Sequence, residues 1–136
     1  MQWFIDATAA NFGNVQLFDT RNRVLRIVGQ HGFESEFLEY FDPVHYDDQC
    51  VCGHAMKQRS RTVIPDVATD PLFSSEVRGV LLRAKVRSVQ STPLLNPLGK
   101  FVGMVSTHGR LPGGPIPDVL GRVDNLCASF LARIEA

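Results

Sequence analysis

The sequence predicts a single α+β domain built on an antiparallel sheet. Two pairs of segments, residues 14–19 with 24–30 and residues 87–95 with 100–108, alternate apolar and polar side chains around a short turn, as β-hairpins do. Helical patterns fall between and after these pairs, which favours α+β over a doubly wound parallel sheet. No glycine-rich phosphate loop follows a strand, so neither mononucleotide fingerprint is present.

Length and composition narrow the class of protein. The chain has 136 residues, of which 44% are hydrophobic and 21% are charged, enough for one domain with its own core. Fourteen basic and fourteen acidic residues cancel, so nothing predicts binding to nucleic acid or to a membrane surface. No apolar run is long enough to span a membrane, and no signal peptide is recognisable. Three cysteines fit a reducing compartment, so we expect a cytoplasmic protein.

Helical spacing of apolar residues predicts two helices in the first third of the chain. One covers residues 2–10 and can be ended by Asn11 and Gly13. The other is ended by Asp42-Pro43 and has four apolar residues on one face. They are Phe33, Phe37, Leu38 and Phe41.

The middle third is expected to alternate loops with short elements. Residues 44–49 form a loop, a helix covers about 51–58, and β-branched residues predict a strand at 62–64. Ser74 or Ser75 can cap the helix that follows.

Two details of the last third are specific. Residues 96–99 place proline second and glycine fourth, as a type I turn prefers, and Gly103 within a strand predicts a bulge or a close neighbour. Asp118 can cap a final helix, and its apolar positions follow the helical period. These are Val119, Leu120, Val123, Leu126, Cys127, Phe130, Leu131 and Ile134. This helix has no glycine stop, so we expect residues 1–136 to be one domain of a longer multidomain protein, or to pair with a copy of itself.

The segment from Cys50 to His54 concentrates two thiols and one imidazole, and three interpretations are open. A thiolate at Cys52, near a helix N-terminus, can have a lowered pKa and become a redox nucleophile. Alternatively, Cys50, Cys52 and His54, with His45, supply donors that zinc accepts, although the usual paired spacing is missing. In the third interpretation the thiols are packing groups beside a small-molecule pocket.

Four blocks in register resemble a GAF domain of the type found beside PAS and histidine-kinase modules in bacterial signalling proteins. They are residues 13–19, 52–55, 86–94 and 103–108, and the match spans nearly the whole chain. The resemblance implies a six-stranded antiparallel sheet flanked by helices, with a pocket on one face under the middle third of the chain. It also implies a homodimer formed through the first and last helices, and a signal passed to an adjacent PAS or kinase-type domain.

The same resemblance raises an enzymatic alternative. One branch of the family reduces free methionine sulfoxide, and Val51-Cys52-Gly53 looks like part of its site. Those enzymes use a further cysteine in the loop corresponding to residues 66–75, where this sequence has none, and Cys127 lies on the apolar stripe of the final helix.

Chromophore and nucleotide binding are the remaining family alternatives. Relatives that attach a bilin have a histidine directly after the cysteine, but glycine follows Cys52. Haem-binding relatives use a histidine, for which His45, His54 and His108 are candidates. The signature of cyclic-nucleotide binding is not found, so no cofactor is expected.

We therefore expect a cytoplasmic, non-catalytic sensor domain that binds a small molecule in a mostly apolar pocket with a few polar groups. A scaffold that binds no ligand is the other alternative. The candidate pocket residues are Tyr46, Cys52, Asp66, Phe73, Leu81, Ser91, Thr92, Ser106 and His108. Ser91 and Thr92 point to opposite faces of their strand, and the sequence does not indicate which face lines the pocket.

Overall fold

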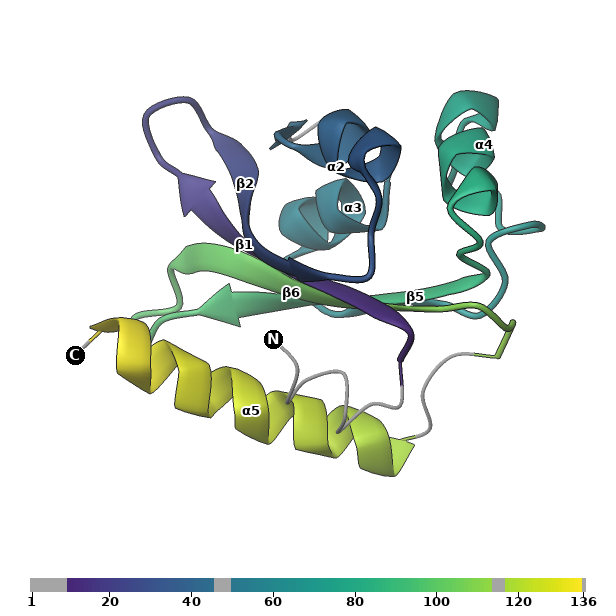
Figure 1. The fold of residues 1–136 in the computed structure, drawn as a ribbon. Coiled ribbons are helices and arrows are strands. Elements are labelled where there is room, and N and C mark those ends of the chain that lie inside the picture. The colour runs from purple at the N-terminus through teal and green to yellow at the C-terminus, as the bar shows by residue number, and fades with distance from the viewer. Residues whose placement is uncertain (1–9, 46–49, 114–116, 136) are drawn as a thin grey trace.

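The computed structural model describes residues 10–45, 50–113 and 117–135, and its middle layer is an antiparallel sheet of six strands (Figure 1). The elements are β1 (Phe12–Asp19), β2 (Val24–His31), α2 (Ser35–Phe41), β3 (Val44–His45), α3 (Val51–Gln58), β4 (Thr62–Ile64), α4 (Ser75–Arg83), β5 (Ser88–Leu95), β6 (Phe101–Gly109) and α5 (Pro117–Glu135). The strand order is β3-β2-β1-β6-β5-β4. This confirms the predicted α+β class and its antiparallel sheet.

The two predicted hairpins form and join at the centre of the sheet. β1 pairs with β2, β5 pairs with β6, and β1 pairs with β6 between them. In the turn before β6, the amide of Gly99 donates to the carbonyl of Asn96 at 2.8 Å, and Gly99 has a φ of +78°, which a glycine adopts without strain. The predicted turn is therefore present.

Gly103 lies where β6 passes close to β1. A Cβ at this position would lie 2.4 Å from the carbonyl oxygen of Gln16, which is too close for any side chain to fit. The predicted close approach of a neighbour is confirmed.

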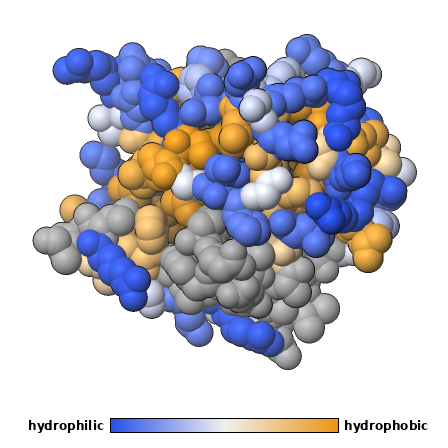
Figure 2. All heavy atoms as spheres, in the orientation of Figure 1, coloured by the Kyte–Doolittle hydropathy of each residue, from blue (hydrophilic) through white to orange (hydrophobic). Residues whose placement is uncertain are grey.

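The helices divide the domain into two cores. α2, α3 and α4 lie on one side of the sheet, and α5 lies along the other (Figure 1). The larger core is between the sheet and α2–α4, and the smaller one, under α5, includes Val15, Leu94, Val105, Val123 and Cys127. Figure 2 shows hydrophobic atoms at the surface between polar side chains over the half that carries α2, α3 and α4.

Two details differ from the sequence prediction, and one predicted helix cannot be compared with the structure. Val44 and His45, expected in a loop, form the two-residue strand β3 against β2. α5 begins at Pro117, so Asp118 lies within its first turn instead of capping it. The helix expected over residues 2–10 lies outside the described residues. None of the described helices combines the length and apolar character needed to cross a membrane.

Candidate ligand-binding site

α3 places Cys52 against the middle of the sheet. The Sγ of Cys50 caps this helix by accepting from the amide of Gly53 at 3.4 Å. Two residues later, the Sγ of Cys52 lies 3.3 Å from the Oγ of Ser106 and 3.5 Å from the Oγ of Ser91. The two serine hydroxyls are 2.6 Å apart and hydrogen-bond each other. The segment that the sequence singled out therefore contacts two neighbouring strands.

Strand register extends this polar strip to a third strand. Asn14 is the register partner of Ser106, and Ser106 is the partner of Ser91. Because side chains alternate along a strand, Asn14 and Gln16 of β1 face the same side as Ser106 and His108 of β6. The face under α2–α4 is thus polar at its centre.

Four polar atoms in this strip are buried without a hydrogen-bond partner among the described residues. They are the Oδ1 of Asn14, the Nε2 and Oε1 of Gln16, and the Nδ1 of His108. The Gln16 amide is also close to the thiol of Cys52, but its geometry satisfies no hydrogen bond. Unpaired buried polar groups are rare in folded proteins, so this concentration needs an explanation.

The residues that carry these four atoms lie at a small cavity of about 20 Å³. All three polar residues line it, and apolar residues of the helices and strands form the rest of its wall. The apolar and thiol-bearing lining residues are Phe37, Phe41, Val44, Cys50, Val51, Cys52, Leu81 and Val89. None of these residues carries a formal charge.

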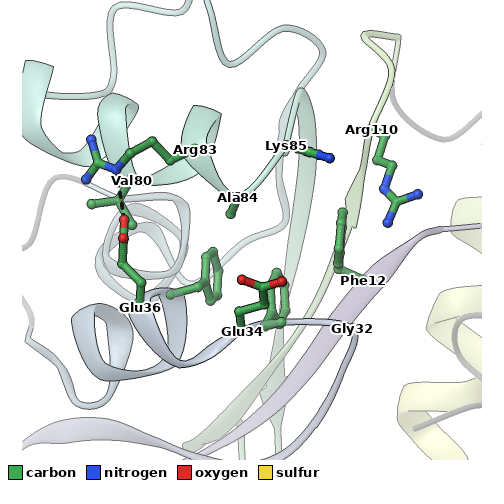
Figure 3. A pocket seen from close by; sticks show the side chains of 11 residues that line it. Phe12, Gly32, Glu34, Glu36, Val80, Arg83, Ala84, Lys85 and Arg110 are labelled. Atoms are coloured by element: carbon green, nitrogen blue, oxygen red, sulfur yellow. Dashed lines mark hydrogen bonds and ion pairs between the residues drawn. The ribbon is translucent and has the colours of Figure 1, made fainter.

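An outer groove of about 240 Å³ lies beside this cavity, lined by residues of α2, α4 and the neighbouring strand ends (Figure 3). Arg83 of α4 and Glu36 of α2 form an ion pair at one end, with Nε and Oε1 2.8 Å apart. Lys85 and Arg110 lie toward the other end in Figure 3. The groove is therefore rimmed by charged side chains, whereas the cavity is not.

Stacked phenylalanine rings separate the groove from the cavity. The ring centroids of Phe33 and Phe37 are 3.8 Å apart in parallel planes, and Phe37 lines both spaces. The ring of His108 meets both rings edge-on, with centroid distances of 5.0 and 5.7 Å. Movement of Phe37 would join the two spaces.

Burial sets the protonation of two lining residues. It lowers the pKa of His108 to about 3, so the imidazole is neutral at physiological pH. It raises the pKa of the Cys52 thiol, and the hydroxyls of Ser106 and Ser91 oppose this effect only in part. The lowered pKa expected for Cys52 at a helix N-terminus is therefore not found, because desolvation outweighs the helix.

The structure brings together part of the predicted site. Cys52, Leu81 and His108 line the cavity, and Ser91 and Ser106 contact Cys52 beside it. Phe73 is buried in the larger core but does not line the cavity, and Tyr46 lies outside the described residues.

Asp66 and Thr92 lie elsewhere. Asp66 is partly exposed and pairs with Arg87, with Oδ1 and Nη2 3.1 Å apart. Thr92 faces α5, where its hydroxyl donates to Gln90 at 2.6 Å and accepts from Arg61 Nε at 2.9 Å. Arg61 also forms an ion pair with Asp124 of α5. Thr92 therefore belongs to a polar network on the opposite face of the sheet.

The metal and haem candidates are dispersed. No group of three potential ligands forms among the described residues, because Cys50 caps α3 while Cys52 faces the sheet. His45 is exposed, His54 is partly exposed, and only His108 lies at the cavity.

Several residues that line the cavity were not predicted from the sequence. Asn14 and Gln16 supply three of the four unpaired atoms, and Phe37 separates the two spaces. The alternation of polar residues with Val15 and Leu17 in β1 was a signal, but alternation alone does not indicate that a polar face is buried.

The sheet order, the helices on both faces and the cavity under α2–α4 define the fold of a GAF domain. Similar structures include a domain assigned to a two-component sensor histidine kinase protein from Sinorhizobium meliloti 1021 (TM-score 0.81, 15% identity, 98% of this chain and 85% of that chain). The GAF domain of a phosphoenolpyruvate-protein phosphotransferase from Coxiella burnetii is also similar (TM-score 0.81, 12% identity, covering 97% of this chain and 76% of that chain). A free methionine-R-sulfoxide reductase from Neisseria meningitidis is similar as well (TM-score 0.67, 20% identity, covering 96% of this chain and 68% of that chain). No family model and no curated protein sequence matches the chain.

Proposed function

We propose that this chain is the sensory domain of a signalling protein and binds a small molecule between its sheet and α2–α4. The similar domains of a sensor kinase protein and a phosphotransferase support the signalling role. The small cavity, which shares Phe37 with the neighbouring groove, supports the location of the ligand.

The observation that carries this proposal is the set of four unpaired polar atoms. A buried donor or acceptor without a partner destabilises a fold by about 1–3 kcal/mol, and a polar ligand group that pairs with these atoms would remove that cost. The rival interpretation, a scaffold that binds nothing, is favoured by the small volume of the cavity. In a scaffold, however, a buried water would have to pair with these atoms, whereas a polar ligand pairs with them on binding.

Binding is expected to reach α5 through β5. Ser91 contacts the cavity side, whereas its neighbours Gln90 and Thr92 belong to the network that holds Arg61. Arg61 in turn donates to the carbonyl of Leu120 in α5 at 3.3 Å. A ligand that prefers one arrangement of β5 would shift the position of α5 by population shift.

The test compares three proteins in an NMR screen of a small-molecule library. Hits that shift the backbone amide signals of residues 14–16 and 104–108 in the parent protein should fail to do so in Gln16→Met. The exposed Gln58→Met variant is the matched control and should bind like the parent. A library that yields no hit at these signals would favour the scaffold.

We propose further that the domain is not itself catalytic and that it works as a homodimer beside a PAS or kinase-type domain. The burial and raised pKa of Cys52 support the first point. Absence of free methionine sulfoxide turnover in the parent protein is expected, and turnover that Cys52→Ala abolishes would contradict it. Light scattering of the protein tests the dimer, and a monomer at high concentration would overturn it.

A further inference from the structure

The wall of the cavity selects for the charge of whatever enters it. Its described lining contains no Asp, Glu, Lys or Arg, and burial keeps His108 neutral. An ion in such a space loses its hydration and gains no counter-charge, which is far more costly than burying a neutral polar group. The charged residues of the neighbouring groove lie on the other side of the Phe33–Phe37 layer.

The unpaired atoms also specify the chemistry of a neutral partner. The side-chain amide of Gln16 presents a donor and an acceptor side by side, and the Oδ1 of Asn14 adds a second acceptor. The group that pairs with a primary amide through two parallel hydrogen bonds is another amide-like group, with N–H and C=O on one edge.

We infer that the cavity receives the uncharged head of a small molecule that carries an N–H donor and a C=O acceptor together, such as a carboxamide, ureide or lactam, and that it excludes anions and cations. This inference rests on the proposed function, because it names the chemical class of ligand for the same site.

The space available indicates how such a molecule is accommodated. A cavity of about 20 Å³ has room for one water molecule and for nothing larger. Phe37 lines both spaces, so its displacement admits the amide head while the rest of the molecule occupies the groove of about 240 Å³. The aromatic rings that line the groove favour a flat, apolar body.

Benzamide, benzoate and benzamidinium test the inference, because they share a ring and differ mainly in the charge of the head. Their dissociation constants are measured by titration into isotope-labelled protein, following the amide signals of residues 14–16 and 104–108. Benzamide should bind at least tenfold more tightly than either ion. Gln16→Met should weaken benzamide at least tenfold, and the exposed Gln58→Met should leave the constant within twofold of the parent.

Each other outcome is decisive. Equal or tighter binding of either ion at these signals overturns the inference but leaves the proposed function intact. If none of the three probes shifts these signals, the inference is also overturned. The library screen then decides the proposed function separately, because charged hits in the cavity would support a ligand site of another chemical class. Benzamide shifts confined to the groove residues, such as Lys85 and Arg110, would likewise overturn the inference.

Discussion

Gln16 and Gln90 are two fully buried glutamines on opposite faces of one sheet, and their surroundings differ in kind. Both side chains are 0% exposed. The amide of Gln90 donates to Thr107 at 3.1 Å and accepts from Thr92 at 2.6 Å, whereas neither polar atom of Gln16 has a partner among the described residues. The same residue type is therefore hydrogen-bonded on one face and unpaired among the described residues on the other.

This contrast predicts opposite effects of one substitution. Gln16→Met keeps the length of the side chain and removes two unpaired polar atoms, so it should raise the free energy of unfolding by about 1–2 kcal/mol. Gln90→Met leaves two threonine hydroxyls without their partner and should lower it by about 2 kcal/mol. Urea denaturation of both variants measures the difference. A Gln16→Met protein less stable than the parent would show that this amide has a structural partner.

Gly103 gives a second prediction at the scale of one residue. Gly103→Ala places a methyl group against the backbone of β1, which cannot move aside as a side chain can, and should destabilise the protein by more than about 2 kcal/mol. Gly29→Ala is the control, because a Cβ there meets no atom within 4 Å. Its thermal midpoint should stay close to that of the parent, and an equal loss in both variants would count against the contact.

At the scale of elements, α4 offers a test of a single cap. The Oγ of Ser74 accepts from the amide of Val77 at 3.2 Å and satisfies one of the free donors at the helix start. Ser74→Ala should therefore lower the free energy of unfolding by about 1 kcal/mol. The exposed Ser75→Ala, one position later, should have little effect, and similar losses at both positions would mean that the cap is not the cause.

Most elements could be predicted because each depends on local chemistry. The turn at Asn96 needs proline and glycine at fixed positions, and α4 needs a serine at its start. β3 could not be predicted, because two residues carry no periodicity and this strand exists only through its pairing with β2. Tertiary contact, not local preference, decides such an element.

The cavity was harder to predict than the fold because helices cover both faces of the sheet. Val15 faces α5 and is buried, and Asn14 and Gln16 face the cavity and are buried as well. Alternation of apolar and polar residues in β1 therefore separated two interior faces, not an interior face from a solvent-facing one. Thr92 and Ser91 could not be assigned for the same reason.

For the whole molecule, His108 predicts how stability depends on pH. Its pKa is about 3 in the folded protein and near 6.5 when exposed, so below pH 6.5 the unfolded chain binds a proton that the folded one does not. The stability contributed by neutral His108 is fully present above pH 6.5 and is lost as pH falls toward 3. Between pH 7 and pH 5 the loss should be about 2 kcal/mol.

Denaturation at a series of pH values measures this loss. His108→Phe keeps a ring of similar shape and should abolish most of the pH dependence in this range. The exposed His31→Gln is the control and should retain the dependence of the parent. If His108→Phe keeps it too, another group causes the acid sensitivity.

The pairing of β1 with β6 has a consequence for synthesis on the ribosome. β1 emerges early, but the strand that completes its hydrogen bonds, in which His108 pairs with Phe12, is made only after β5 and the turn at Asn96. At 5–20 residues per second, the first hairpin waits roughly 4–16 seconds for its neighbour. During that interval its apolar side chains have no sheet to join, so chaperones are expected to meet the nascent chain chiefly at this stage.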